Sequence, residues 1–280
     1  MSKRNSQSAK TAARERLRQE RERQAKRAKV RRQFIVAGSV VVVLAAAGGI
    51  GYAVVQANKP GYWESEKDAK VVAPANTSGT DGTTVTIGKS SATKTLKIYE
   101  DPRCPICAQF EQTVGSTVKK DVDDGKYKIQ YVGGTFIDGD SLGKGKVGSN
   151  GEGSKKALSA LGAALNVSPE AFLDYKTALY SKKWHPDETD DKFKNDSYLI
   201  EVADTVPALK NNTKFQNAVK NGTYDAWALA MSKTFDTNKD GVTGTPSFVM
   251  DGKMLTADGQ GNPPMTVDDF NRVVDAALKG

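Results

Sequence analysis

The longest apolar stretch of the chain runs from Phe34 to Val55, and its 22 residues carry no charge. As a helix rising 1.5 Å per residue it would be about 33 Å long, which is enough to cross the hydrocarbon core of a bilayer. The pattern therefore predicts a transmembrane helix over residues 34–56. A signal peptide cleaved after Ala57 stays an alternative, because Val55-Gln56-Ala57 loosely resembles a small-residue cleavage site.

Residues 57–82 show no sustained periodicity and contain Pro, Gly, Ser and Thr, which is typical of a linker. The remaining residues, 83–280, are numerous enough for one domain with a sizeable hydrophobic core. Within them, alternating apolar residues and β-branched residues predict strands over 84–87, 95–99, 126–132 and 246–250.

Segments with helical spacing lie between and after these strands. A helix is expected from the first cysteine through about Lys120, and others over 155–165 and 223–235. Two further helix starts are marked by capping residues, at Ser168-Pro169 and at Thr266. The order of elements predicts an α/β sheet that is interrupted by a helical insertion at about residues 154–235.

The positive charge of the chain is concentrated at its start. The whole sequence has 41 Lys+Arg and 33 Asp+Glu, but residues 1–33 alone have 13 and 3, which leaves 28 and 30 for the rest. By the positive-inside rule this basic arm is cytoplasmic and the domain beyond the apolar segment is extracytoplasmic. Because the basic charge belongs to the arm, we expect contact with anionic lipid and no nucleic-acid partner.

The two cysteines, Cys104 and Cys107, stand in a Cys-Pro-Ile-Cys frame. A structural zinc site usually has four Cys or His ligands, whereas this chain has two cysteines and one histidine. A disulfide that closes so short a loop contributes little stability. On the extracytoplasmic side the natural use of the pair is redox chemistry.

The local sequence supports a reactive first cysteine. A strand that runs into Cys104, followed directly by a helix, places this sulfur at a helix N-terminus, where unpaired N–H groups and the helix dipole stabilise a thiolate. Pro105 has no N–H to lose and suits the first helical turn. Cys107, one turn further, is then the resolving thiol.

The segment IYEDPRCPICAQFE resembles the active-site segment of DsbA-like thioredoxin-fold proteins. The resemblance rests on Asp101, on the Cys-Pro-x-Cys frame and on Phe110, and it extends over about residues 85–280. It implies a thioredoxin-like fold with a helical insertion. It also implies a cis-proline loop facing the disulfide, for which Thr245-Pro246 is the candidate and which would hold the substrate chain.

Three positions bear on how oxidising the pair is. Ile106 stands where the most oxidising members have a histidine, so one stabiliser of the Cys104 thiolate is missing. Ile98 stands where related proteins often have an acid, six residues before the first cysteine. Arg103 either supplies positive charge to Cys104 or points into solvent. We expect Asp101, Arg103, Pro105 and Ile106 to tune the redox pair.

Three other features are weak candidates for sites. Gly143 to Gly148 fits G-x-G-x-x-G but lies in a long Gly-rich loop instead of a tight strand-to-helix turn. Asp236 to Gly241 resembles the start of a calcium loop, but Ser247 stands in place of the glutamate at position twelve. We expect a surface loop, a polar turn and, at His185, a surface histidine.

These observations predict a membrane-anchored, extracytoplasmic thiol-disulfide oxidoreductase that forms disulfides in exported proteins. The pair is itself the redox centre, so no cofactor and no metal are expected. The expected partners are exported proteins with thiols and a membrane protein that reoxidises the pair. A reductase or isomerase of particular exported proteins and a noncatalytic thioredoxin-fold adaptor remain alternatives.

Overall fold

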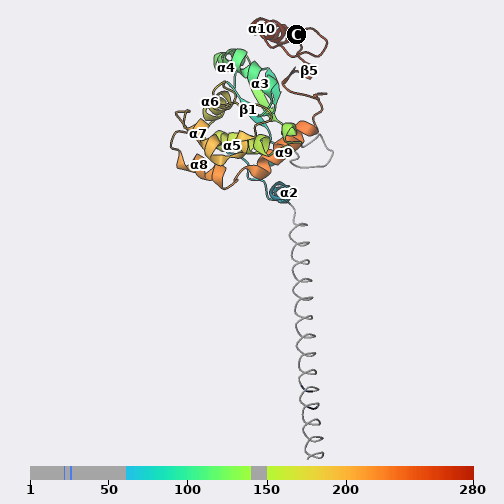
Figure 1. The fold of residues 1–280 in the computed structure, drawn as a ribbon. Helices are drawn as coiled ribbons and strands as arrows, with labels where there is room; N and C mark the ends of the chain where they lie inside the picture. Colours follow the sequence, from blue (N-terminus) through green and yellow to red (C-terminus); the bar gives the residue numbers. More distant parts are fainter. Residues whose placement is uncertain (1–21, 23–25, 27–60, 140–149) are drawn as a thin grey trace, which may run out of the picture. The chain divides into compact units, whose positions relative to one another are not determined.

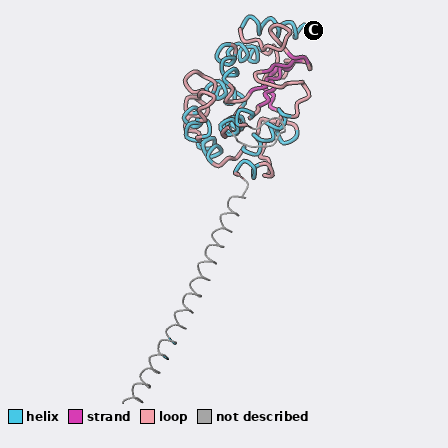
Figure 2. The backbone as a smooth tube through the Cα atoms, turned by 45° about the vertical axis from the view of Figure 1, so that its right-hand side comes forward, coloured by secondary structure: helices cyan, strands magenta, loops and turns pink. Residues whose placement is uncertain are grey.

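The strands expected from the alternating pattern form one mixed sheet in a computed structural model that describes residues 22, 26, 61–139 and 150–280. Among these residues the sheet has five strands in the order β1-β3-β2-β4-β5. They are β1 (Val85–Ile87), β2 (Thr95–Glu100), β3 (Lys128–Gly133), β4 (Ser247–Met250) and β5 (Lys253–Met254). β2 and β3 are parallel and the other pairs are antiparallel. The strands gather in one region with helices beside them (Figure 2).

The central strand β2 carries the chain through the core to the cysteines. Leu96 and Ile98 point to the same face of the sheet because side chains alternate along a strand, and both are buried. They pair with Ile129 and Tyr131 of β3. β2 ends at Glu100, four residues before Cys104, so the cysteine loop begins at the middle of the sheet.

The helical stretch expected through about Lys120 is two helices, α3 (Pro105–Thr113) and α4 (Gly115–Asp124). Val114 lies between them with φ −115°, well away from the ideal helical value near −63°, and its side chain is fully buried. Gly115 permits the close contact at this bend, because a Cβ there would lie 2.9 Å from a carboxylate oxygen of Glu111. Burial of Val114 and the low helix propensity of glycine therefore break the expected helix.

Between β3 and β4 the described chain is largely helical. The helices are α5 (Gly153–Val167), α6 (Pro169–Leu179), α7 (Asp196–Ala203), α8 (Thr213–Lys220) and α9 (Asp225–Asp236) (Figure 1). Ser168 caps α6 as expected, since its hydroxyl accepts the N–H of Ala171 at 3.0 Å. The sequence pattern did not separate α7 and α8, which are eight residues each.

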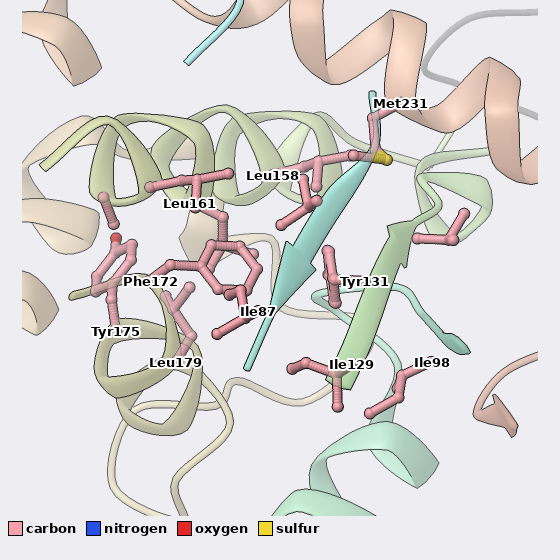
Figure 3. Close-up of a cluster of buried hydrophobic side chains, with 14 of the residues drawn as sticks. Ile87, Ile98, Ile129, Tyr131, Leu158, Leu161, Phe172, Tyr175, Leu179 and Met231 are labelled. Carbon is pink, nitrogen blue, oxygen red and sulfur yellow. The ribbon is translucent and has the colours of Figure 1, made fainter. Parts of the chain in front are cut away.

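The helices α5, α6 and α9 share one hydrophobic core with the sheet. Figure 3 shows Leu158 and Leu161 of α5 and Phe172 of α6 directed into the same cluster as Tyr131 of β3. The rings of Phe172 and Tyr131 meet edge to face with centroids 5.2 Å apart. The insertion is therefore packed onto the sheet instead of forming a core of its own.

The C-terminal helix α10 (Val267–Lys279) begins at the cap expected at Thr266, whose hydroxyl accepts the N–H of Asp269. Its Phe270 contacts Phe110 of α3 and Phe248 of β4, with ring centroids 5.8 and 6.0 Å apart. This aromatic cluster holds the cysteine helix and the strand after Pro246 against each other.

From Gly61 onward the structure differs from the linker expected over 57–82. Residues 62–66 form the short helix α2 (Tyr62–Glu66), in which Trp63 is only 3% exposed. The Tyr62 hydroxyl donates to Asp225 at 2.8 Å, and the Trp227 indole N–H donates to the Gly82 carbonyl at 2.8 Å. Aromatic burial and these bonds make 61–82 part of the same compact unit as the rest of residues 61–280.

The transmembrane helix expected over 34–56 lies outside the described residues. Among the residues that are described, no helix is both long enough and apolar enough to cross a bilayer.

Candidate active site

Cys104 forms the N-cap of α3 and lies at the end of the central strand. Its sulfur accepts the backbone N–H of Cys107 at 3.4 Å, and Pro105 occupies the first helical position. Both cysteines are free thiols here and both are buried. The N-terminal N–H groups of α3 thus point at the first sulfur, as the sequence predicted.

The two thiols have opposite acidities. The pKa of Cys104 is lowered to about 6 by hydrogen bonding from the Cys107 thiol, against the effect of burial, with further help from the N–H groups of Cys107 and Ile106. Burial raises the pKa of Cys107 well above its ordinary value, and the nearby Glu100 carboxylate adds to this effect. Cys104 is therefore the thiolate and Cys107 the thiol near neutral pH.

The loop before β4 brings the predicted proline to the cysteines. The Thr245–Pro246 peptide bond is cis, as the sequence predicted. The carbonyl oxygen of Thr245 lies 3.7 Å from the Cys104 sulfur. Thr245 is half-buried and the preceding Thr243 and Gly244 are exposed, so the bend before β4 brings solvent-facing backbone close to Cys104.

Two apolar residues that follow Cys104 in the sequence are exposed. Ile106 is 46% exposed, and Pro105 next to it is exposed as well. A half-exposed isoleucine directly beside a buried reactive sulfur offers contact area to an unfolded or extended polypeptide.

Asp101 is fully buried and does not contact the cysteine sulfurs in any described bond. Its carboxylate accepts the N–H of Arg103 at 2.9 Å, the hydroxyl of Ser154 at 2.7 Å and the N–H of Ile137 at 3.0 Å. Burial raises the pKa of this carboxyl to about 7 despite these bonds. Asp101 holds the loop before Cys104 to α5 and to the segment after β3.

Arg103 takes neither of the two orientations expected from the sequence. Its guanidinium is buried and bonds to Asp138 at 2.7 Å and to the Glu188 carbonyl at 2.7 Å, with Asp191 at 3.3 Å. The reason is the buried acid Asp138, which needs a positive partner in an apolar surrounding. The charge of Arg103 is thus used inside the protein, and no described bond directs it to Cys104.

Asp138 is a central polar residue that the sequence did not reveal. It accepts bonds from Arg103, from the backbone N–H of Ser154 and from both the N–H and the ammonium of Lys155. It therefore satisfies two N–H groups in the first turn of α5 and is shared by two buried cations. In the sequence Asp138 is marked only by its place in a turn after β3, and surface acids often occupy such turns, so the position does not reveal its burial.

A buried ion cluster lies near Cys107. Lys176 of α6 contacts Glu100 at 2.9 Å and Glu111 at 2.6 Å, and Glu100 is fully buried. Burial raises the pKa of Glu100 to about 8, against the opposing effect of the Lys176 ammonium. Ile98 stands six residues before Cys104, where related proteins often have an acid, and it is buried and apolar. Glu100 lies two residues further along β2, on the same face of the strand.

His185 is not the surface histidine that the sequence predicted. It is half-buried, its Nε2 lies 3.2 Å from the carbonyl oxygen of Pro102, and its ring stacks on Tyr180. Burial lowers its pKa. Tyr180 in turn packs in one cluster with Cys104, Cys107 and Ala108. The neighbouring aromatic residues explain the position of His185, which no motif marks.

The described residues contain no group of three or more potential metal ligands. In the segment that resembles a calcium loop, Asp240 binds Lys97 at 2.7 Å and Tyr99 at 2.5 Å, and Asn238 accepts the N–H groups of Asp240 and Val242. These bonds make the segment a closed polar turn. The glycine-rich motif at 143–148 lies outside the described residues.

Known proteins of similar sequence align with most of residues 61–280. A family model described as "Thioredoxin" matches residues 80–276. The chain is 25% identical over 196 residues to "Disulfide bond formation protein D" of Bacillus subtilis, covering 69% of this chain and 77% of that protein. It is also 28% identical over 173 residues to the serine/threonine-protein kinase PknE of Mycobacterium tuberculosis, and the match spans only 29% of the kinase.

Solved structures share the fold at lower identity. The reduced disulfide bond oxidoreductase DsbG of Mycobacterium tuberculosis matches with a TM-score of 0.53 at 23% identity, over 76% of this chain and 97% of that one. MdbA, a thiol-disulfide oxidoreductase from Actinomyces oris, matches with a TM-score of 0.55 at 19% identity, over 75% of this chain and 92% of that one.

Proposed function

The chain belongs to the thioredoxin family, among its DsbA-like thiol-disulfide oxidoreductases, and from its cysteine pair we propose that it forms disulfide bonds in exported proteins while anchored in the cell membrane. The observation that carries the proposal is the geometry of the pair, in which the Cys104 sulfur caps α3, accepts the Cys107 N–H at 3.4 Å and lies 3.7 Å from the Thr245 carbonyl oxygen. Because Cys104 has a pKa lowered to about 6, its thiolate stabilises the reduced enzyme, and a stabilised reduced form makes the disulfide a stronger oxidant.

The reaction begins with the enzyme disulfide between Cys104 and Cys107. A substrate thiolate attacks the Cys104 sulfur, the S–S bond breaks, and Cys107 leaves as a thiolate that takes up a proton, as its raised pKa favours. A second substrate thiolate then attacks the substrate sulfur of the mixed disulfide, and Cys104 leaves as a stabilised thiolate. The substrate gains a disulfide and two electrons stay on the enzyme as a dithiol.

Residues around Cys104 are suited to hold the substrate chain. The exposed backbone at Gly244 and Thr245 lies beside the sulfur and offers hydrogen bonds to an extended peptide. Ile106 and Pro105 are exposed at the start of α3 and offer apolar contact. A membrane protein that withdraws the two electrons would then restore the disulfide.

The sequence supports the membrane anchor and its orientation. The uncharged segment 34–55 follows a region of 13 Lys+Arg and 3 Asp+Glu, so the start of the chain is cytoplasmic and residues 61–280 are extracytoplasmic. Protease added to wall-less intact cells tests this, because it should remove the domain and leave a short membrane-bound fragment. A domain protected until the cells are lysed would contradict the orientation.

The direction of electron flow is tested by the reduction potential of the full chain in detergent, equilibrated against glutathione buffers. A value toward about −120 mV supports a donor of disulfides, whereas a value near about −270 mV would identify a reductase and overturn the proposal.

Cys107→Ser should accumulate mixed disulfides with exported proteins in cells. If Cys104→Ser and Cys107→Ser both leave the thiol state of every exported protein unchanged, the adaptor alternative replaces the enzyme.

A further inference from the structure

The loop before Cys104 is held by one segment of the helical insertion. We call residues 180–188 the clasp segment; it follows α6. The Tyr180 hydroxyl donates to the Asp101 carbonyl at 3.0 Å, His185 Nε2 lies 3.2 Å from the Pro102 carbonyl, and the Arg103 guanidinium donates to the Glu188 carbonyl at 2.7 Å. Three successive loop residues are thus bonded to one segment about 80 positions away in sequence.

The clasp segment is itself firmly placed. The Tyr180 and His185 rings stack with centroids 5.7 Å apart and planes 16° apart, and His185 meets Phe193 edge to face. The Tyr180 N–H bonds the Lys176 carbonyl of α6, and Gln112 of α3 donates to the Tyr180 carbonyl at 2.7 Å. Tyr180 is therefore tied to α6, to the loop and to the cysteine helix at once.

These contacts bear directly on the reacting sulfur. The N–H of Cys104 donates to the same Asp101 carbonyl that Tyr180 binds, and this bond closes the turn that leads into α3. The turn decides how the Cys104 sulfur lies relative to the N–H groups of Cys107 and Ile106, which stabilise its thiolate. Tyr180 also packs in the cluster that contains both cysteines.

The chemistry of the contacts fixes the role of each group. A carbonyl oxygen only accepts, so His185 donates from Nε2 to the Pro102 oxygen, and the Tyr180 hydroxyl donates to the Asp101 oxygen. The two hydrogen bonds hold the Asp101 and Pro102 carbonyl oxygens, which are the negative ends of their peptide dipoles, toward the clasp segment. Without them the Pro102 carbonyl loses its bond to His185 and the Asp101 carbonyl keeps the bond from the Cys104 N–H, so the turn before α3 is held less firmly and its N–H groups align less well on the sulfur.

We propose that Tyr180 and His185 are positioning residues that set the reduction potential of the cysteine pair by holding the Asp101 and Pro102 carbonyls. They take no part in the exchange of bonds and act through the placement of Cys104. The inference rests on the proposed redox function of the pair. It goes beyond that function in assigning control of the pair to the helical insertion.

The test compares two tyrosines in one region of the full chain. Tyr180→Phe removes the hydroxyl that binds the loop. The matched control Tyr175→Phe removes an equally buried hydroxyl, which donates to the Leu199 carbonyl at 2.9 Å within the insertion. The thermal midpoint, the equilibrium constant with glutathione and the pKa of the Cys104 thiolate from its ultraviolet absorbance are measured for each.

We expect both variants to lose similar thermal stability, because both lose one buried hydroxyl bond. Tyr180→Phe alone should shift the glutathione equilibrium toward the enzyme disulfide, by threefold to tenfold, and raise the pKa of Cys104. A tenfold shift corresponds to about 30 mV. His185→Leu should act in the same direction, and His185→Gln, which keeps an N–H donor, should act less.

The proposal is overturned if Tyr180→Phe changes only the thermal midpoint, or if Tyr175→Phe shifts the equilibrium equally. In the second case general loosening of the insertion, and not the clasp, affects the pair. Failure of the proposed function is distinguishable from this, because it would show in the wild-type chain, whose reduction potential would then lie near about −270 mV.

Discussion

The sulfur of Cys104 lies 3.7 Å from the carbonyl oxygen of Thr245, although the two residues are 141 positions apart. The contact joins the end of the central strand β2 to the loop that enters β4, the strand next to it in the sheet. The Cys104 sulfur and the backbone that we propose binds the substrate peptide thus lie in the loops next to two adjacent strands. The packing of Phe110 on Phe248, at 4.4 Å between ring centroids, keeps these two elements together.

The reactivity of Cys104 should depend on pH with a midpoint near 6. Because its pKa is lowered to about 6, the thiolate predominates at pH 7 and the alkylation rate with iodoacetamide should fall about tenfold per pH unit below 6.

The lowered pKa of Cys104 also stabilises the folded reduced protein above this value, and this stability is lost as pH falls through 6. The unfolding free energy of the reduced protein, relative to the oxidised, should therefore rise by roughly 2 to 3 kcal/mol from pH 6 to pH 8. A midpoint near 9 for alkylation would contradict the assignment.

Ile106→His should make the pair more oxidising. Ile106 is half-exposed and its N–H is among the groups that stabilise the Cys104 thiolate, so an imidazolium at this position lies near the negative sulfur. An opposite charge at close range lowers a pKa by about one unit or more. The pKa of Cys104 from thiolate absorbance and the glutathione equilibrium measure the effect. Ile106→Asn, which adds polarity without charge, is the control, and equal shifts in the two variants would exclude the electrostatic explanation.

Lys176→Met should be strongly destabilising, and more so at high pH. It removes the ammonium between Glu100 and Glu111, and breaking a buried ion pair costs about 3 to 5 kcal/mol. With Lys176 in place Glu100 loses its proton near pH 8, and without the ammonium it keeps the proton to higher pH, so the loss in stability grows above about pH 8. Urea unfolding at about pH 7 and about pH 9.5 measures it.

The control for this experiment is Lys119→Met, which removes a lysine that is 40% exposed and lies 3.6 Å or more from its acidic partners. Exposed pairs of this kind contribute about 0 to 1 kcal/mol. A loss for Lys176→Met that is equal at both pH values would show that packing of the lysine stem, and not charge, is responsible.

Asp138→Asn should destabilise the protein by about 3 to 5 kcal/mol, because it leaves the buried Arg103 and Lys155 cations without their shared carboxylate. Urea unfolding measures the loss. Asp174→Asn, which removes an exposed acid 3.8 Å from Lys119, is the matched surface change and should cost less than about 1 kcal/mol. Similar values for the two variants would mean that Asp138 does not neutralise the cluster.

Trp63→Ala tests whether residues 61–82 belong to the folded unit. Trp63 is buried against the domain, so truncation should cost about 3 to 5 kcal/mol of unfolding free energy, measured with urea on the full chain. Val72→Ala, at an exposed position in the same segment, should change stability by less than about 0.5 kcal/mol. A neutral Trp63→Ala would restore the linker interpretation.

The local features of the site could be predicted from the sequence. Cys104 as N-cap, Pro105 at the first helical position, and the caps at Ser168 and Thr266 all depend on bonds within three residues. Such bonds are specified by the residues themselves, whatever surrounds them. The strands could be predicted as well, because the alternation of Leu96 and Ile98 with polar residues reflects one buried face of the sheet.

Only the tertiary structure decided where the charged side chains go. Arg103, Asp138, Glu100 and Lys176 belong to residue types that are usually exposed, and no spacing in the sequence marks them as partners. Arg103 and Asp138 are 35 positions apart, and Tyr180 and Asp101 are 79 apart. Burial of one charge makes its partner necessary, and that burial exists only once the insertion packs on the sheet. The sequence by itself therefore determined the cysteine pair that we propose exchanges disulfides, and the tertiary structure decided what surrounds the two sulfurs and sets their acidity.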